Sequence, residues 1–321
     1  MVRFIFRRFG NSIVLLIGSS MLAFLVVGLT RGDYFDVMRL DPAISANTVE
    51  ALRLQHGLNR PLAVRYVVWL ESALRGEGGF SFAYNSPAGP IIWPRARNTL
   101  LLTASATSLA WVMSLIAGIC AAVRPGIWTR LVIDGSSSIL LAVPELVLAL
   151  LLLLFAVRTG FFPTGGMMSA GASDLDLWAR MKDLAAHLVL PALCLAAGLM
   201  PFIASHIRAA LSEVLKSPFI TAAEAHGLSF SRIVIRHALP AAANPLISLL
   251  GISIGLLISS SLLVEAMFSW PGVGQLLLEA ILRRDFFLVI DSTVLATAFL
   301  IAGNLIADVL LYATDPRIRA K

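Results

Sequence analysis

The sequence contains little charge and almost no lysine. Charged residues make up 14% of its 321 residues and hydrophobic residues make up 58%, whereas soluble domains carry about 25% charged residues. Lys182, Lys216 and Lys321 are the only lysines, so arginine carries nearly all of the net charge of +6. Too few polar side chains are present to cover a water-exposed surface, which excludes a disordered chain and an ordinary soluble enzyme. The mean hydropathy of +0.85 instead predicts an integral membrane protein.

Signatures of disulfides, metal sites and nucleotide sites are missing as well. Cys120 and Cys194 both lie within apolar runs, where a cysteine is usually a small buried side chain rather than half of a disulfide. The five histidines do not fall at metal-ligand spacing with cysteines or acids. No Gly-x-x-x-x-Gly-Lys-Ser/Thr and no Gly-x-Ser-x-Gly motif occurs. The sequence therefore predicts no metal ligand, no cofactor and no catalytic residue in this chain.

Long apolar runs are what the sequence has in abundance. A membrane-spanning helix needs about 20 predominantly apolar residues. The runs that qualify are residues 11–29, 100–123, 131–157, 184–211, 245–264 and 287–311. The first is too long for the apolar core of a signal peptide and has no small-residue cleavage site after it, so we expect a span there too. The sequence thus predicts an all-α membrane protein with six transmembrane helices.

The distribution of basic residues predicts the orientation of these spans. Cytoplasmic loops carry an excess of Lys and Arg. If the N-terminus is cytoplasmic, the inner segments hold Arg3, Arg7, Arg8, Arg124, Arg130, Arg208, Lys216, Arg232, Arg236, Arg317, Arg319 and Lys321. The short outer loops are close to electrical balance. We therefore expect both termini in the cytoplasm, and we interpret the basic balance as a sign of cytoplasmic loops rather than of a nucleic-acid partner.

The spans and loops divide the chain into four parts. Residues 1–30 form an N-terminal transmembrane helix, and residues 31–98 form an extracytoplasmic segment with helices expected at 48–56 and 62–74. Residues 99–312 form the transmembrane core, which contains a long cytoplasmic loop at 211–244. Residues 313–321 form a cytoplasmic tail.

The long inner loop contains the signals of a short exposed helix. Ser217 can cap a helix, Pro218 suits its first position, and Gly227 is a natural end. Between them, Phe219, Ala222, Ala223 and His226 fall at i, i+3, i+4 and i+7 and so share one face. Two interpretations remain from these residues alone: a surface helix that merely connects two spans, or a helix that docks into a cleft on a partner.

Several polar groups lie within the apolar runs. Glu145 follows Pro144 in the third run, where an ionisable group either lines a cavity or pairs with an arginine of a neighbouring span. Asp308 is expected to hold helices together near the inner surface. Asp134 and Asp291 stand at the starts of spans and are most simply interfacial. The run Trp270-Pro271-Gly272-Val273-Gly274 predicts either an ordinary outer turn or a re-entrant element, because such backbone must be buried or line a water-filled path.

Ordered motifs along nearly the whole chain resemble one family. Ala223-x-x-x-Gly227 with Arg-His-Ala-Leu-Pro at 236–240 resembles the Glu-Ala-Ala loop of importer-type ABC transporter permeases. Further motifs resemble the dipeptide/oligopeptide/nickel members of that family: Gly-Leu-Asn-Arg-Pro-Leu at 57–62, Trp-Pro-Gly-Val-Gly at 270–274, Arg-Asp-Phe at 284–286, and Asp-Pro-Arg-Ile-Arg at 315–319. The family usually carries Arg at the positions of Thr221 and Glu224, so the charge pattern of the loop differs here.

The resemblance implies a type I importer permease in the bacterial inner membrane. It implies a second homologous permease, two cytoplasmic ATP-binding subunits and an extracytoplasmic solute-binding protein as partners, with the lipid bilayer around the spans. The residues expected to couple the chain to the ATPases are Phe219, Ala222, Ala223, Glu224 and Gly227. The candidates for the translocation pathway are Pro144, Glu145, Glu265, Trp270, Pro271 and Gly272. Peptides are the expected solutes.

Other functions remain as alternatives. Nickel or another small solute of the same family could be the substrate, because the binding protein does most of the choosing in that family. A membrane-embedded enzyme would need paired reactive groups at one membrane depth, and the sequence offers only Glu145 and isolated histidines. A secondary transporter commonly shows inverted repeats, and none is visible between the halves of this chain.

Overall fold

The structure is a computed structural model that describes residues 2–30, 32, 34–39, 45–123, 126 and 133–314. Nearly all of this part is helical, apart from one two-stranded antiparallel ribbon of β1 (Phe80–Ser81) and β2 (Ser86–Pro87). Its long apolar helices are α1 (Val2–Leu29), α5 (Ala88–Val123), α9 (Leu177–Leu215), α13 (Ala243–Met267) and α15 (Phe286–Thr314). In the described residues, five helices are long and apolar enough to cross a membrane, or six if one bent pair counts as a single span. The tail from residue 315 onward and the inner-loop arginines Arg124 and Arg130 lie outside the described residues.

The long helices extend beyond the predicted apolar runs. Helix α5 begins twelve positions before the expected residue 100, and α9 covers 39 residues with Pro191 and Pro201 inside it. Hydropathy alone places a boundary where charge begins, at Arg95 and Arg97 for α5, but helical hydrogen bonding continues past that point. At 1.5 Å per residue, α5 and α9 are each more than about 50 Å long. Both are therefore longer than a bilayer crossing requires.

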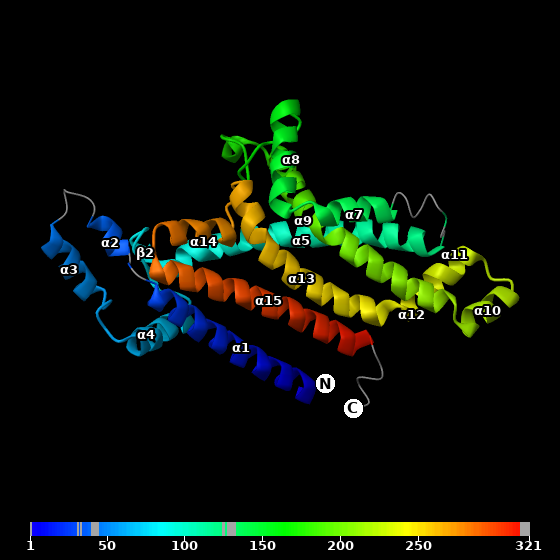
Figure 1. Ribbon diagram of the computed structural model, residues 1–321, viewed down its shortest axis with the longest axis horizontal. Helices are drawn as coiled ribbons and strands as arrows, with labels where there is room; N and C mark the ends of the chain where they lie inside the picture. Colours follow the sequence, from blue (N-terminus) through cyan, green and yellow to red (C-terminus); the bar gives the residue numbers. More distant parts are fainter. Residues whose placement is uncertain are drawn as a thin grey trace.

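The third predicted run is broken more sharply than expected. Its described part forms α7 (Gly135–Ala142) and α8 (Glu145–Thr159), whose axes diverge by 100°. The residue before a proline avoids the α region, and Val143 is indeed extended at φ −87° and ψ 117°. Pro144 then stands at the N-cap of α8, which projects from the bundle at the top of Figure 1 and packs against α9 and α13. The break that Pro144 predicts in the third run is therefore present, and its 100° angle is the part that the sequence does not predict.

Small residues allow the long helices to pack closely. A Cβ added to Gly118 of α5 would lie 2.7 Å from the Cγ2 atom of Ile207 in α9. Between α13 and α15, an added Cβ at Gly251 would lie 2.2 Å from the Ala307 Cβ, and one at Gly303 would lie 2.6 Å from Ile254 Cγ2. Helices in a membrane associate through such close contacts, because lipid gives them little hydrophobic driving force.

The shorter helices gather at the two ends of the bundle. At one end lie α2 (Tyr34–Met38), α3 (Ala46–Gln55) and α4 (Leu62–Leu74), which confirm the two helices predicted in the segment after the first span. Helix α14 (Val273–Leu282), which was not predicted, follows α13 near that end, and η2 (Ala172–Asp174) lies in the loop after α8. At the other end lie α10 (Pro218–Ala225), α11 (Phe230–Ile233), the π-helical turn η3 (Val234–Ala238) and α12 (Leu239–Ala241). Figure 1 shows that α1 begins and α15 ends toward this second end, away from α2–α4.

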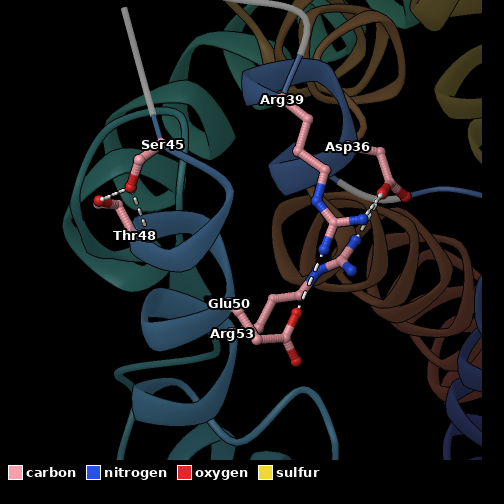
Figure 2. A network of polar contacts seen from close by, with 6 residues as sticks. All are labelled: Asp36, Arg39, Ser45, Thr48, Glu50 and Arg53. Atoms are coloured by element: carbon pink, nitrogen blue, oxygen red, sulfur yellow. Dashed lines mark hydrogen bonds and ion pairs between the residues drawn. The ribbon is translucent and has the colours of Figure 1, made fainter.

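Ion pairs join α2 to α3 in the segment after the first span. Arg53 donates to Asp36 Oδ1 at 2.7 Å, and Arg39 donates to Glu50 Oε2 at 3.2 Å. Arg39 also lies 4.0 Å from Asp36, so the two arginines share its carboxylate (Figure 2). The Ser45 hydroxyl caps α3 by accepting from the Thr48 amide at 3.1 Å. These contacts shape the segment into a folded element, although pairs this exposed add only about 0–1 kcal/mol each.

Two buried carboxylates attach this segment to the start of α15. Asp285 Oδ2 accepts hydrogen bonds from the Ser81 hydroxyl at 2.7 Å and from the Ala83 amide at 3.0 Å. Asp291 Oδ1 accepts from the Trp69 indole at 2.6 Å, and its Oδ2 accepts from the Gly79 amide at 2.7 Å. The prediction that Asp291 is merely interfacial is wrong, since it is buried and ties two distant segments together. We call Asp285, Asp291 and their four donors the carboxylate clamp.

Glycine is required where the clamp brings the backbone against α15. An added Cβ at Gly79 would lie 2.4 Å from Phe287 Cβ, and one at Gly78 would lie 2.8 Å from Asp291 Oδ2. Gly78 also has a φ of +67°, a conformation that side chains with a Cβ rarely adopt. The loop before β1 therefore lies as close to α15 as backbone allows, and this closeness lets the Gly79 amide reach the Asp291 carboxylate.

Candidate functional site

The start of α10 follows the predicted pattern with one difference. Pro218 occupies the first turn of α10, as expected from its fixed φ and missing amide. Ser217 stands at the cap position with extended backbone, but its hydroxyl donates to the Val214 carbonyl instead of accepting from α10. The preceding helix α9 ends only two residues earlier, so its unpaired C-terminal carbonyls compete for this hydroxyl. The prediction of a side-chain cap is wrong here, although the helix itself is confirmed.

The end of α10 is a Schellman motif. The Gly227 amide donates to the Glu224 carbonyl at 2.9 Å, and the Leu228 amide donates to the Ala223 carbonyl at 3.3 Å. Gly227 has a φ of +76°, and nothing lies within 4 Å of a Cβ built on it. Glycine is therefore needed at this position for its backbone conformation rather than for space. The predicted role of Gly227 as the end of the helix is confirmed.

One side of α10 packs against its own bundle and the other is exposed. Ile220 is buried at 2% exposure in a cluster with residues of α9, α11 and η3, and Ala223 packs against the same cluster. Ala222 and Ala225 lie on the side opposite Ile220 and are exposed. Phe219 is 48% exposed along one edge. The predicted face is thus split: the structure exposes Phe219, Ala222 and His226 but turns Ala223 toward the core, and Glu224 and Gly227 are exposed.

The turn after α13 is buried and densely hydrogen-bonded. Trp270 is fully buried, and its indole donates to the Asn98 carbonyl at 3.0 Å while the Asn98 amide side chain donates to the Pro271 carbonyl at 2.7 Å. Thr99 Oγ1 accepts from the Val273 amide at 2.8 Å. Asn98 and Thr99 of α5 were missed from sequence, because their partners lie about 170 positions further along the chain and no local pattern marks them.

Glu265 lies under this turn rather than in an open cavity. It is 0% exposed, and its Oε2 accepts from the Gly274 amide at 2.6 Å. A Cβ added to Gly272 would lie 2.3 Å from the Glu265 carboxyl carbon, and one added to Gly274 would lie 2.4 Å from Leu262 Cα. The two glycines thus let the chain fold directly onto the carboxylate, which holds the turn that begins α14.

Pro144 and Glu145 stand at the bend between α7 and α8. Pro144 is exposed and Glu145 is half-buried in the first turn of α8, where the helix dipole favours an acid. In the part of the chain that the structure describes, no arginine, lysine or histidine lies within ion-pair distance of Glu145. Arg208 of the neighbouring helix α9 instead donates to Asp134 at 2.6 Å. Arg208 and Asp134 therefore join α7 to α9, a contact that was not predicted.

Two further observations bear on the predicted residues. Asp308 of α15 forms an ion pair with Arg8 of α1 at 3.1 Å, which confirms a helix-joining role for Asp308. Across the described ranges, no three His, Cys, Asp or Glu side chains are grouped so that they could hold a metal ion.

Replacing Gly274 with alanine is expected to lower the thermal stability of the purified protein. The new Cβ would overlap Leu262 Cα in the turn, and overpacking of this kind costs about 1–3 kcal/mol. Gly198 is a matched control, because it lies in α9 with nothing within 4 Å of an added Cβ. Gly198→Ala should be neutral or stabilising by about 0.4–1 kcal/mol. Melting curves in detergent that show equal changes for both variants would contradict the close packing of the turn.

Two protein-family models match this chain. The model described as binding-protein-dependent transport system inner membrane component matches residues 114–320. The model described as binding-prot-dependent transport system membrane comp, N-term, matches residues 1–90. Together they include α1 and α2–α4 as well as α10 and the turn after α13.

Curated relatives match over the full length. The oligopeptide transport system permease protein AppB of Bacillus subtilis is 34% identical over 320 residues, which cover 99% of each chain. The di/tripeptide transport system permease protein DppB of Pseudomonas aeruginosa is 31% identical, with 99% of each chain covered. The glutathione transport system permease protein GsiC of Escherichia coli is 30% identical, with 100% of each covered.

A solved structure shares the fold. A chain of the MetNI methionine ABC transporter in an inward-facing conformation matches with a TM-score of 0.58 and 22% identity, covering 70% of this chain and 96% of that one. Permeases of this family carry no ATPase site of their own, and the ATPase activity of an importer lies in separate subunits that act with a solute-binding protein. The chain belongs to the binding-protein-dependent transport system inner membrane component family, as an inner-membrane permease subunit of an ABC importer.

Proposed function

We propose that this permease imports peptides. Three relatives that match it over their whole length are named for oligopeptides, di- and tripeptides, and glutathione. The observation that carries the coupling part of the proposal is α10, a short helix whose outward side presents the small side chains of Ala222 and Ala225 beside the exposed Phe219. The opposite side of α10 is held against the bundle by the buried cluster around Ile220. A push on α10 is therefore transmitted to α9 and α11 rather than absorbed by a loose loop.

Helix α10 is the element that seats on an ATPase subunit. Ala222 and Ala225 permit close approach of a groove, and Phe219 supplies an apolar side chain of the size that anchors interfaces. Glu224 is exposed beside them and offers one charge for an ion pair. Gly227 turns the chain sharply away after the helix, so nothing beyond α10 obstructs the groove. Ala223 supports the docking helix from behind through its contact with the core.

A second permease covers α8. This helix projects from the bundle at the top of Figure 1 and packs one side against α9 through Ala149 and Ala156, while its other side is apolar and exposed. Leu150, Leu151 and Leu154 are each at least half exposed, at 50%, 53% and 51%. In a chain that lies in a bilayer, such a surface faces either lipid or another protein, and we assign the surface of α8 to another protein. Because α8 begins at Glu145, a second permease that packs on α8 would complete a pathway beside this carboxylate. The assembly then contains two permeases and two ATPases.

The solute passes the bend between α7 and α8. Pro144 breaks the helix and Glu145 offers an unpaired carboxylate there, a group suited to the amide and ammonium groups of a peptide. Glu265, Trp270, Pro271 and Gly272 shape the outer wall through the buried turn rather than contacting the solute directly. We assign these different roles from burial, because Glu145 is partly buried, whereas Glu265 and Trp270 are both 0% exposed.

The chain crosses the membrane six times, with α7 and α8 as one broken crossing and both termini in the cytoplasm. The positions of α1, α15 and α10 support this topology, because α1 begins and α15 ends toward the end of the bundle that carries α10 (Figure 1). Residues 31–98 then form the extracytoplasmic segment, 211–244 the cytoplasmic coupling loop and 313–321 the cytoplasmic tail. The transmembrane core is the stretch 99–312.

Topology can be read from cysteine labelling. In a background without Cys120 and Cys194, cysteines replace Asn47 of α3 and Ser231 of α11, both of which are exposed. A membrane-impermeant maleimide added to intact spheroplasts should label Asn47→Cys and reach Ser231→Cys only after the membrane is opened. Labelling of Ser231→Cys in intact spheroplasts would contradict the orientation.

Arginine at the centre of the exposed side of α10 should uncouple the transporter. Ala222→Arg and Ala225→Arg place a long charged side chain where the groove must approach closely, and each should lower the recovery of ATPase subunits with the permease at least tenfold. Uptake of peptide should fall with it. The measurement is co-purification of the ATPases, followed by uptake in vesicles.

Two variants separate coupling from other defects. Thr221→Arg adds the same charge at the side of the helix, where relatives usually carry arginine, and should keep the ATPases bound. Glu145→Gln should also keep them bound while changing the rate of uptake or the preference among peptides. If Ala222→Arg and Ala225→Arg retain the ATPases and wild-type uptake, α10 is only a connector and the coupling proposal fails.

A further inference from the structure

A cavity of about 570 Å³ lies between α1, α4, α5 and α15. Its walls are mostly aliphatic and carry two tryptophan rings, and they include Ile13, Ile17, Trp69, Leu70, Trp93 and Leu295. We call this cavity the side cavity. Helices α1 and α4 lie along the lower edge of the bundle in Figure 1, whereas α8 projects from the top. The side cavity therefore lies away from the surface that we assign to a second permease.

The side cavity opens toward the hydrocarbon of the bilayer. Helices α1, α5 and α15 are each long and apolar enough to cross a membrane, and most of α1 and α15 is left exposed by the rest of the described chain. Ile13, Ile17 and Trp93 line the cavity and are nevertheless 44%, 42% and 53% exposed. Tryptophan is enriched where hydrocarbon meets the headgroups, so the end of the cavity at Trp93 lies near that boundary. A lipid beside the protein can thus reach the cavity without leaving its leaflet.

Polar groups in the walls of the side cavity already have hydrogen-bond partners. The Ser20 hydroxyl donates to the Ile17 carbonyl at 2.8 Å and lies 3.0 Å from the Tyr66 hydroxyl. Asp291 accepts through both of its carboxylate oxygens within the carboxylate clamp. A buried water needs about two to four polar partners, and groups that are already engaged offer few. The walls therefore favour an apolar occupant over water.

The volume of the side cavity suits a hydrocarbon chain. Sites for small molecules usually measure about 300–1,000 Å³, and the 570 Å³ found here fall within that range. Apolar walls gain van der Waals contacts only when something fills the space between them. The occupant must be apolar, flexible enough to follow walls that come from four helices, and abundant at this depth. Acyl chains of the surrounding bilayer meet all three requirements.

We infer that the side cavity binds one acyl chain of a membrane phospholipid. The inference goes beyond the proposed function, because it rests on the place of this protein in the membrane and not on the identity of its solute. Trp69 and Asp291 line the cavity and also belong to the carboxylate clamp. The bound chain therefore packs between α1 and the clamp, and it adds to the direct contacts of α1 with α4 and α15.

The number of phospholipids that stay bound to the importer tests this inference. The complex is reconstituted with palmitoyl-oleoyl phosphatidylethanolamine, washed in detergent and weighed by native mass spectrometry. Ala298→Phe fills the cavity from α15, so it should retain one phospholipid fewer per copy of this chain than wild type. Ala302→Phe makes the same change at an exposed position one turn further along α15 that does not line the cavity, and it should retain as many as wild type. Ala73→Phe fills the cavity from α4 and should act like Ala298→Phe, which keeps the test decisive if one of the two fails to assemble.

A photoreactive probe identifies the occupant in the assembled importer. Benzoylphenylalanine in place of Leu74, which lines the cavity and is exposed, should form an adduct with the mass of a phospholipid on irradiation. The inference is overturned if wild type and both filled variants retain equal numbers of phospholipids, or if Ala302→Phe loses one as well. It is also overturned if the probe joins this chain to another polypeptide. Each of these results leaves the import of peptides untouched, so the failure of the inference is distinct from a failure of the proposed function.

Discussion

Two carboxylates buried at the start of α15 must have hydrogen-bond donors, and those donors come from the segment before α5. An unpaired buried carboxylate would cost several kcal/mol, so Asp285 and Asp291 commit Trp69, Gly79, Ser81 and Ala83 to fixed positions. The glycines at 78 and 79 make the approach possible. The consequence is that the segment between α1 and α5 is fixed to the start of α15.

The rest of the bundle continues this connection toward the other end of the molecule. Helix α15 packs closely on α13 at Gly251 and Gly303. Helix α13 follows α12 and η3 in the chain, and η3 contributes Ala238 to the cluster that holds Ile220 of α10. A continuous set of packed elements thus joins the carboxylate clamp to the exposed side of α10. An importer needs such a connection, because the binding protein and the ATPases act on opposite faces of the membrane.

Local signals in the sequence predicted local structure well. Helix α4 has the predicted bounds of 62–74, and α10 lies between the predicted proline start and glycine end, because proline and glycine act through their own backbone conformations. The family could likewise be recognised from motifs in order along the chain. The existence of α10 could be predicted from the same residues, although which of its sides is exposed depends on what Ile220 packs against.

Features that depend on distant partners could not be predicted. Asp291 and Trp69 are 222 positions apart, and nothing near either residue in the sequence marks the other. The same holds for Asn98 and Thr99 beneath the turn at 270–274. Pro144 predicted a break, but the 100° divergence of α8 depends on how α9 and α13 pack around it. Hydropathy, finally, predicts helices that are too short where the ends of the helix are polar, as at the start of α5.

The central claim is that the segment between α1 and α5 moves with α15 as one body. Spin labels on Val64 of α4 and Ile306 of α15, both exposed, report the distance between the two by double electron–electron resonance in a background without Cys120 and Cys194. In the assembled transporter that distance should form one narrow distribution that is the same without nucleotide and with ATP bound, and Asp291→Ala should broaden it. A distance in the unaltered clamp that shifts between the two nucleotide states would contradict the account.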